Sequence, residues 1–405
     1  MLHGLENLLI YVVPFLFVLG LVVTIHELGH FLAAKACGVA VDQFSIGFGR
    51  PLLRWRDRSG VNWQVAWIPL GGYVRFSGDE TAASVPDHED LMALRRHVLL
   101  EEGPEALRRY FHFKPVWQRA IVVVAGPLAN FVLSTVLFAI LLMAVGESLV
   151  PARVDRLVAG GAAAQAGFQI GDVITSIDGK PIEDGFGQLQ EYVGLRAGVP
   201  IRFTVTRGGQ TQTLTAIPAL QEMTNPIGKQ KVGVLGIEGI QKPGDVTHRR
   251  YDPLHAIIGG ADRTWKTLKT TVFVVGRLIH GQVPADQLSG PLGIAQTSGA
   301  IAHVGAEGAP NAWLAFVGGL IALLGLAAVL SVSIGFMNLL PVPVLDGGHL
   351  LFYAYEAVAR RPLGGRIQAA GYRVGLALLL GLMLFATWND LQRLRVFQIL
   401  GGLFS

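Results

Sequence analysis

The chain has 405 residues, of which 15% are charged, and its formal net charge at pH 7 is +4. An ordinary soluble domain carries roughly 25% charged residues, so this deficit, together with a mean hydropathy of +0.46, argues against a protein that is soluble throughout. A hydrophobic fraction of 51% excludes a disordered chain, and a single cysteine excludes a disulfide scaffold and any multi-cysteine metal site.

Four stretches contain no Asp, Glu, Lys or Arg, and they lie at roughly 7–26, 120–146, 308–345 and 374–389. Because about 20 apolar residues cross a bilayer as a helix, each stretch predicts one membrane span. The third is long enough for a span and an irregular extension. No basic residue precedes the first, which therefore indicates a retained helix and not a cleaved signal peptide.

Basic residues predict the orientation of these spans. They gather after the first span, before the second, and between the third and fourth (Lys35, Arg50, Arg54; Arg108, Arg109, Lys114, Arg119; Arg360, Arg361, Arg366, Arg373). By the positive-inside rule these connections are cytoplasmic. Both termini and the long segment 147–309 are then expected outside the cytoplasm. The small, scattered net charge does not indicate nucleic-acid binding.

The sequence of the long outer segment predicts a β-rich soluble module. It contains GGAAAQAGF at 160–168, GDVI at 171–174 and IDGKPI at 177–182, and its Asp-Gly and Gly-Gly pairs predict hairpin turns. Over roughly 150–240 these motifs resemble a PDZ domain of the bacterial protease-associated type. The resemblance implies a peptide-binding loop at Val234, Leu235, Gly236 and Ile237, which would accept a peptide by strand addition.

The first apolar stretch ends in the sequence His26-Glu27-Leu28-Gly29-His30. Residues four apart share one helix face, so both imidazoles can reach one metal ion while Glu27 is offset from them. An acidic residue at the end of a membrane span is costly to retain without a role. The pattern predicts a zinc site of the HExxH type, and two interfacial histidines with a snorkelling glutamate are the alternative.

Catalytic zinc prefers three protein ligands, so the two histidines need a partner. Asp346 is the candidate, at the cytoplasmic end of the third apolar stretch in the sequence NLLPVPVLDGGH (338–349). Pro341 and Pro343 cannot continue a helix, and irregular backbone at membrane depth is tolerated where it lines a wet cavity. His349 is the second candidate ligand, and sequence spacing cannot choose between the two.

Three motifs and the outer module together resemble the site-2 protease family of intramembrane zinc metalloproteases. The motifs are HELGH in the first span, Gly126-Pro127-Leu128-Ala129-Asn130 in the second and NLLPVPVLDGGH in the third, and the module is the PDZ-like one. The bacterial regulator-of-sigma-E protease branch is the most similar. The resemblance implies that His26, His30 and Asp346 bind one Zn²⁺ and that Glu27 is the catalytic acid/base. Asn130 either helps to stabilise the oxyanion or bonds across helices.

The first cytoplasmic connection carries GFG at 47–49 and the β-prone run VNWQVAWIPLGGYVRF at 61–76. This segment resembles the membrane-reentrant β-hairpin of the family, whose edge strand pairs with an unwound substrate. An interfacial hairpin without substrate contact is the alternative. The residues expected to bind substrate are Gly71, Gly72, Asn338, Pro341 and Pro343.

One departure from the family concerns the outer region. The better-known members of the branch carry two tandem PDZ domains, whereas this chain has signature and room for one. A size-exclusion mechanism that needs a PDZ pair is therefore in doubt here. The segment 262–269 suggests an amphipathic helix on the outer membrane surface, and SGPLGI at 289–294 is similar to a family segment.

The expected fold is a polytopic α-helical membrane protein with four transmembrane helices, a reentrant β-hairpin and one extracytoplasmic β-rich PDZ domain. Its expected parts are a first transmembrane helix with HExxH (1–36), a cytoplasmic loop with the hairpin (37–115), a second transmembrane helix (116–147), the PDZ domain (150–240), a linker with an interfacial helix (241–308), a third transmembrane helix with the LDG motif (309–348), a cytoplasmic connection (349–371), a fourth transmembrane helix (372–390) and an outer tail (391–405).

The expected activity is hydrolysis of peptide bonds in or near the transmembrane segment of single-span proteins in the bacterial inner membrane. Expected substrates are an anti-sigma factor trimmed by an earlier protease, or remnant signal peptides. The competing interpretations are a transporter with a PDZ appendage and a membrane-tethered PDZ scaffold. Cys37 is expected to be a small packing residue, with a role as a metal ligand as the alternative.

Overall fold

The computed structural model of the chain describes residues 2–78, 88–182, 185–225, 228–239, 247–281 and 289–393. It divides into two compact units. The first consists of Met1–Ala139, Ile257–Val275 and Leu288–Ser405, and the second of Ile140–Ala256 and Gly276–Gln287. From position 394 onward, the predicted outer tail lies outside the described residues, as do 240–246 and 282–288 of the predicted linker.

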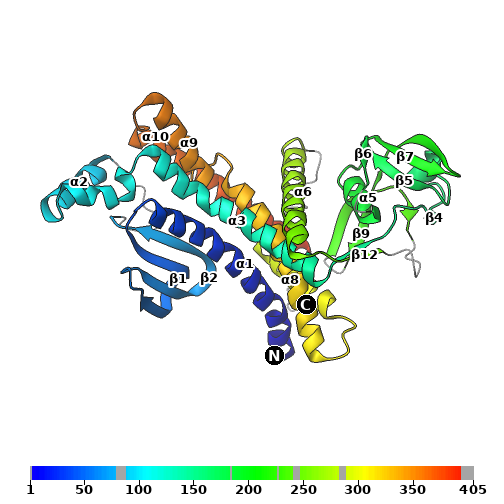
Figure 1. Cartoon of the computed structure of the whole chain (residues 1–405), viewed down its shortest axis with the longest axis horizontal. Helices are drawn as coiled ribbons and strands as arrows, with labels where there is room; N and C mark the ends of the chain where they lie inside the picture. The colour runs from blue at the N-terminus through cyan, green and yellow to red at the C-terminus, as the bar shows by residue number, and fades with distance from the viewer. Residues whose placement is uncertain are drawn as a thin grey trace, which may run out of the picture. The chain divides into compact units, whose positions relative to one another are not determined.

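Four helices among the described residues are long and apolar enough to cross a membrane (Figure 1). They are α1 (Leu2–Ala36), α3 (Val116–Ala144), α8 (Ala312–Asn338) and α10 (Gly365–Arg393). Each covers all or most of one of the four apolar stretches of the sequence. Many of their large apolar side chains are exposed, as a lipid-facing surface requires, and these include Leu9, Val13, Val132, Phe316 and Leu384.

Small residues let these helices approach one another closely. A Cβ at Gly29 of α1 would collide with the carbonyl oxygen of Ala125 in α3 and would lie 2.7 Å from the Cβ of Ala129. The Gly in HELGH is therefore a packing residue that holds the motif against α3. Such small-residue contacts are typical of membrane helices, where close backbone approach drives association.

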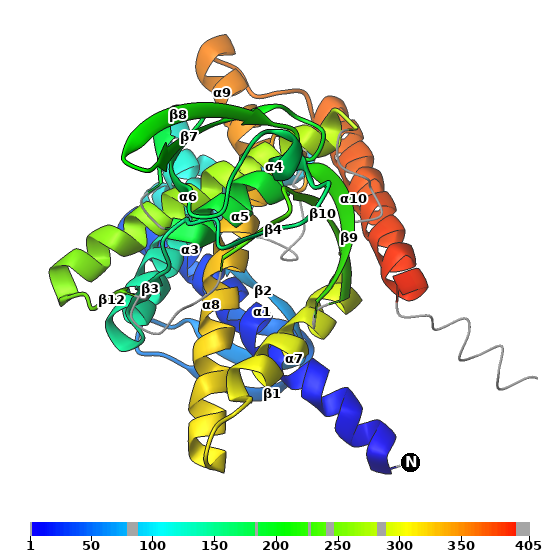
Figure 2. The same ribbon diagram turned by 90° about the vertical axis from the view of Figure 1, so that its right-hand side faces the viewer.

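Shorter helices complete the helical part. They are α2 (His88–Glu101), the 3₁₀ helices η1 (Pro104–Arg109) and η2 (Phe111–Phe113), α6 (Pro253–Ile279), α7 (Pro291–Ala306) and α9 (Asp346–Ala359). Helix α7 packs against α1 and α8 (Figure 2). Helix α6 contains the predicted amphipathic segment, and Thr264 donates a hydrogen bond to Ser134 of α3. A position of α6 on the membrane surface stays a prediction.

The predicted hairpin consists of the long antiparallel strands β1 (Val41–Arg56) and β2 (Asn62–Phe76) beside α1 (Figure 1). Both strands bend, so residues 43–46 of β1 pair with 62–65 on one side and with 72–75 on the other. Gly47 and Gly49 have φ values of 87° and 89°, which only glycine adopts easily. Among the described residues, the segment 72–75 pairs with one neighbouring strand, residues 43–46, and forms an edge of the sheet.

The two ends of the hairpin differ in the exposure of their apolar side chains. Near α1, Phe44 packs edge-to-face on Phe31 with ring centroids 5.6 Å apart, inside a buried apolar cluster. The far end exposes large apolar side chains, namely Leu52, Leu53, Trp55, Trp67 and Ile68. Burying so much apolar surface in lipid is favourable, which is compatible with the predicted reentrant hairpin but does not establish it.

The second unit is β-rich. Its main sheet has the order β6-β5-β7-β8, and its other strands form three two-stranded pairs, β3 with β12, β4 with β11 and β9 with β10. The elements are β3 (Glu147–Leu149), β4 (Arg156–Leu157), α4 (Ala162–Gln165), β5 (Val173–Ile177), β6 (Lys180–Pro181), α5 (Gly185–Gly194), β7 (Ile201–Arg207), β8 (Gln210–Ala216), β9 (Ala219–Asn225), β10 (Gly228–Val234), β11 (Ile237–Glu238) and β12 (Thr247–Arg249).

The hairpin turns in this unit fall where the sequence predicted them. Asp178 and Gly179 have φ values of 48° and 77°, and Gly208 and Gly209 have values of 56° and 85°. Two consecutive residues with positive φ form the tight turn that matches strand twist. The strands enclose an apolar core that includes Val154, Phe168, Ile174, Leu189 and Phe203.

Candidate active site

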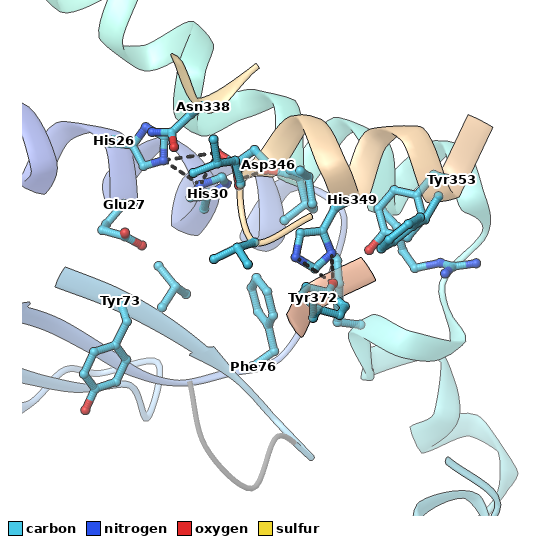
Figure 3. A pocket seen from close by; sticks show the side chains of 18 of the residues that line it. His26, Glu27, His30, Tyr73, Phe76, Asn338, Asp346, His349, Tyr353 and Tyr372 are labelled. Atoms are coloured by element: carbon cyan, nitrogen blue, oxygen red, sulfur yellow. Dashed lines mark hydrogen bonds and ion pairs between the residues drawn. The ribbon is translucent and has the colours of Figure 1, made fainter. Parts of the chain in front are cut away.

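The HExxH motif lies near the C-terminal end of α1. His26 and His30 are one turn apart on the same face, and their Nε2 atoms are 3.2 Å from each other (Figure 3). The side chain of Glu27 points away from this pair, toward the hairpin strand that carries Tyr73. The i, i+4 spacing therefore brings two imidazole nitrogens to one point and leaves the carboxylate beside them, as the sequence predicted.

Asp346 completes this group from the other end of the chain. Its Oδ2 lies 3.2 Å from Nε2 of His26 and 3.5 Å from Nε2 of His30. The three candidate ligand atoms all lie within 4.8 Å of one another. The group that could hold a metal ion contains Asp346 and does not include His349, which favours Asp346 of the two candidates that the sequence left open.

The turn between α8 and α9 places Asp346 at this point. A Cβ at Gly347 would collide with the carbonyl oxygens of Leu339 and Leu340, so the two glycines after Asp346 let α9 fold tightly onto the turn. Val344 has a φ of 108°, a conformation that a β-branched residue rarely adopts. Strain of this kind tends to persist where surrounding structure holds a functional residue in place.

Helix α3 fixes the ring of His30. Nδ1 of His30 lies 2.9 Å from the carbonyl oxygen of Val122, which can only accept, so Nδ1 carries the proton and donates it. Nε2 then keeps its lone pair on the side of Asp346. Gly126 is required nearby, because a Cβ at this position would collide with the His30 ring. The glycine of the GPLAN sequence thus makes room for a histidine of HELGH.

The geometry fits a zinc ion. Oδ2 of Asp346 is buried and has no hydrogen-bond partner among the described residues apart from the imidazole nitrogens that face it. A carboxylate oxygen facing the lone pair of His30 Nε2 is unfavourable unless a cation lies between them. Two imidazole nitrogens and one carboxylate oxygen are a donor set that zinc takes in catalytic sites. The residues present therefore suit the metal.

A cavity of about 840 Å³ adjoins the three side chains. It is lined by His26, Glu27, His30, Asp346 and Asn338, and on the hairpin side by Gly71, Gly72, Tyr73, Val74 and Phe76. A Cβ at Gly72 would lie 3.1 Å from Cγ of Glu27, so the hairpin strand contacts this residue directly. The edge strand of the hairpin therefore forms one wall of the cavity, next to the acidic residue of HExxH.

The opposite part of the cavity is more polar than the sequence suggested. The hydroxyl of Tyr372 lies 3.2 Å from the ring of His349 (Figure 3). Arg119 of α3 and Glu356 of α9 form an ion pair at 2.6 Å. Sequence analysis did not identify Tyr372, Arg119 or Glu356 as cavity residues. Arg119 was used only to predict the topology, and no sequence motif links α3 with α9. The acceptor Val122 could not be found either, because a backbone carbonyl leaves no mark in a sequence.

The remaining predicted site residues lie elsewhere. Asn130 is fully buried behind His26, and its Nδ2 lies 3.2 Å from Nδ1 of His26. Pro341 and Pro343 do not line the cavity, and Pro343 packs against Gly371 of α10. Cys37 packs against the apolar cluster under the hairpin.

The loop of Val234, Leu235, Gly236 and Ile237 belongs to the second unit. Leu235 is buried in the core of this unit, and its carbonyl oxygen accepts from the backbone N–H of Ala163. Ile237 pairs with Leu157 in the short β4–β11 ladder. Its peptide-binding role stays a prediction.

Comparison with known protein families decides the class of the enzyme. A family model described as peptidase family M50 matches residues 14–382. The chain belongs to peptidase family M50. The predicted membership of the site-2 protease family is therefore confirmed.

Curated relatives extend this match over the whole chain. Metalloprotease MmpA of Caulobacter vibrioides is 55% identical over 98% of this chain and 99% of its own length. A putative zinc metalloprotease of Agrobacterium fabrum, Atu1380, is 42% identical over 95% and 96%. Regulator of sigma-E protease RseP of Salmonella typhimurium is 30% identical over 94% and 98%.

This M50 protein is therefore an intramembrane zinc metalloprotease of the site-2 type, with Zn²⁺ as its cofactor. The transporter and scaffold interpretations are replaced by this assignment. The alignment with RseP extends over 477 positions, more than the 405 residues of this chain, so that relative carries additional segments.

Proposed function

We propose that this protease hydrolyses peptide bonds in or near the transmembrane segment of single-span membrane proteins, with His26, His30 and Asp346 holding the zinc ion and Glu27 acting as acid/base. The observation that carries this proposal is the placement of the three ligand atoms and Glu27 at a cavity walled by an edge strand.

Zinc held by these three side chains would polarise the scissile carbonyl and acidify the attacking water. Glu27 removes a proton from that water as its oxygen bonds to the carbonyl carbon. The same carboxyl group then delivers the proton to the amine nitrogen as the C–N bond breaks. Gly72, which has no side chain, leaves room for Glu27 beside the hairpin strand and so keeps the carboxyl group next to the edge where the substrate would bind.

A transmembrane helix must unwind before it is cut, because its carbonyls are engaged in its own hydrogen bonds. The edge-strand segment 72–75 lines the cavity and can take over these bonds by strand addition. Asn338, at the C-terminal end of α8, lines the same cavity and supplies a side-chain amide to the extended peptide. Pro341 and Pro343 act indirectly, by ending α8 and shaping the turn before Asp346.

The finer topology belongs to the same proposal. The distribution of basic residues supports, by the positive-inside rule, an inner-membrane protein with its zinc site toward the cytoplasm and with both termini and the β-rich unit outside it. The β-rich unit acts as a single PDZ-like module whose loop at Val234, Leu235, Gly236 and Ile237 binds peptide. RseP is named for regulation of sigma-E, so an anti-sigma factor shortened by another protease is the first substrate to test.

The deciding experiment replaces Glu27 by Gln in the full chain purified in detergent. Cleavage of a synthetic transmembrane peptide should fall by about 10²-fold or more, since general acid–base catalysis contributes roughly 10²–10⁴-fold. The zinc content should stay at one per chain, because Glu27 is not among the ligands. Wild-type cleavage rates in the Gln variant would refute the proposed role of Glu27.

A further inference from the structure

Asn130 is held rigidly behind the zinc site. Its side chain is fully buried on α3, and its backbone carbonyl accepts a hydrogen bond from the hydroxyl of Ser331 in α8 at 2.8 Å. A Cβ at Gly335 would lie 3.1 Å from the Cβ of Asn130, so α8 also packs directly on this residue. The amide is therefore fixed in place and cannot swing into the cavity.

The two polar atoms of the Asn130 amide differ in their hydrogen bonding. Nδ2 faces Nδ1 of His26 at 3.2 Å, while Oδ1 is buried without a hydrogen-bond partner among the described residues. A buried acceptor without a donor costs free energy. A half-turn of the amide plane exchanges Oδ1 and Nδ2 without moving the carbon skeleton, and the choice between the two orientations is decided by the neighbouring hydrogen bonds.

The orientation of Asn130 determines the tautomer of His26. If Nδ2 donates to Nδ1, the proton of His26 lies on Nε2, which is the atom that faces Asp346 and His30. If Oδ1 accepts from Nδ1–H, the unpartnered oxygen is satisfied and the lone pair of Nε2 points at the other two ligands. Only the second arrangement lets the imidazole bind a metal through Nε2.

The partner of His30 supports the second arrangement. Nδ1–H of His30 already donates to the carbonyl of Val122. Metal-binding histidines generally donate their second ring N–H to a carbonyl or carboxylate oxygen, which fixes the ring and its tautomer. Val122 and Asn130 lie on the same helix, so α3 would present one acceptor oxygen to each of the two histidines.

We propose that Asn130 is a positioning residue that accepts a hydrogen bond from Nδ1–H of His26 and so holds the Nε2 lone pair of His26 toward the zinc ion. This inference rests on the proposed function, in which His26 is a zinc ligand. It replaces the role of Asn130 as a donor to the oxyanion, because Asn130 does not line the cavity and its side chain is fully buried.

The test measures zinc affinity of the full chain in detergent by competition with a chelator of known affinity. Asn130→Leu removes the acceptor and should lower zinc affinity 10–100-fold, the usual loss for such an outer partner. Asn130→Asp keeps an acceptor oxygen but cannot donate, and should bind zinc within about threefold of wild type. Ser134→Ala, one turn further along α3, is the matched control and should leave zinc affinity unchanged.

Two outcomes overturn the inference. One is wild-type zinc affinity in folded Asn130→Leu, and the other is a tenfold or greater loss in folded Asn130→Asp. An oxyanion donor would give a different pattern, in which both variants bind zinc normally and both lose cleavage. If the Leu variant does not fold, ¹⁵N spectra of labelled histidine in the wild-type chain decide, since the proton of His26 must then be found on Nδ1.

The same series separates this inference from the proposed function. His26→Ala should abolish stoichiometric zinc binding. If His26→Ala binds zinc as wild type does, the proposed ligand set is wrong, whatever Asn130 does. If His26→Ala loses zinc while Asn130→Leu keeps it, the ligand set stands and only the role of Asn130 is refuted.

Discussion

Gly72 of the hairpin lies directly against Glu27 of α1, because a Cβ at Gly72 would lie 3.1 Å from Cγ of Glu27. This contact joins the edge strand to the acidic residue of the HExxH motif, and both residues line the same cavity. A peptide that extends the sheet at 72–75 would therefore run past Glu27.

The first prediction concerns the conformation of the substrate. Replacing one residue beside the scissile bond of a transmembrane peptide by Gly should raise kcat/KM about fivefold, because Gly weakens a helix by roughly 1 kcal/mol and strand addition requires the helix to open. Cleavage of paired peptides in detergent measures this. The control peptide carries the same Gly two turns away, and equal rates for both would contradict strand addition at the hairpin edge.

The second prediction concerns Gly126, whose missing side chain makes room for the ring of His30. Gly126→Ala should displace this ring, lower the zinc content of the purified protein and reduce peptide cleavage at least tenfold, because small displacements of catalytic groups are costly. Metal analysis and a cleavage assay measure the effect. Gly20→Ala in α1 is the matched control, since a Cβ there meets nothing within 4 Å.

Sequence reasoning and the structure agree most where a side-chain pattern carries the information. Four apolar stretches predicted the four long helices, and the motifs around His26 and Asp346 indicated two segments that the structure brings together. The Asp178-Gly179 turn also followed from residue type. In each case a pattern of neighbouring residues carries the signal, and the residue types that zinc requires link the two distant motifs.

Long-range geometry could not be predicted in the same way. The double pairing of residues 43–46 depends on how β2 bends back, and the choice of Asp346 over His349 depends on the direction of a turn. The carbonyl of Val122 belongs to the backbone and is the same in every residue type. The ion pair of Arg119 with Glu356 joins two helices whose contact no local pattern encodes.

The third prediction is a pH dependence in the β-rich unit. Arg207 forms a two-pronged ion pair with the buried Asp172, at 2.7 and 2.8 Å, and holds the pKa of the Asp172 carboxyl below its usual value. A lowered pKa in the folded state stabilises the unit above pH ~4, the pKa of an unfolded aspartate. This stabilisation is lost as the pH falls through the lower, folded pKa.

Hydrogen exchange of β5 and β7 amides in the full chain measures this prediction. Protection should decrease as the pH is lowered below about 4 in the wild type, once the intrinsic pH dependence of exchange is subtracted. Arg207→Ala should lower the local stability at pH 7, because it removes the ion pair of a buried carboxylate. Arg202→Ala, an exposed arginine of the same strand, is the control. Equal protection in both variants would show that the ion pair is not stabilising.

The fourth prediction concerns Arg119 and Glu356, which are both largely buried at 15% and 19% side-chain exposure. Arg119→Ala should lower the thermal unfolding temperature of the detergent-solubilised protein, since Glu356 would remain as an uncompensated charge. The double variant Arg119→Met with Glu356→Leu should recover most of the loss, because apolar residues of similar volume replace a buried ion pair well. A double variant as unstable as the single one would contradict this explanation.

The position of Asp346 on a late helix also has a consequence for how the enzyme is made. The histidines of α1 leave the ribosome first, and Asp346 follows only after the β-rich unit and α8 have been synthesised. At roughly 5–20 residues per second this interval lasts tens of seconds. During that time the nascent chain holds only two of the three proposed ligands, so the proposed zinc site stays incomplete until α9 has been synthesised.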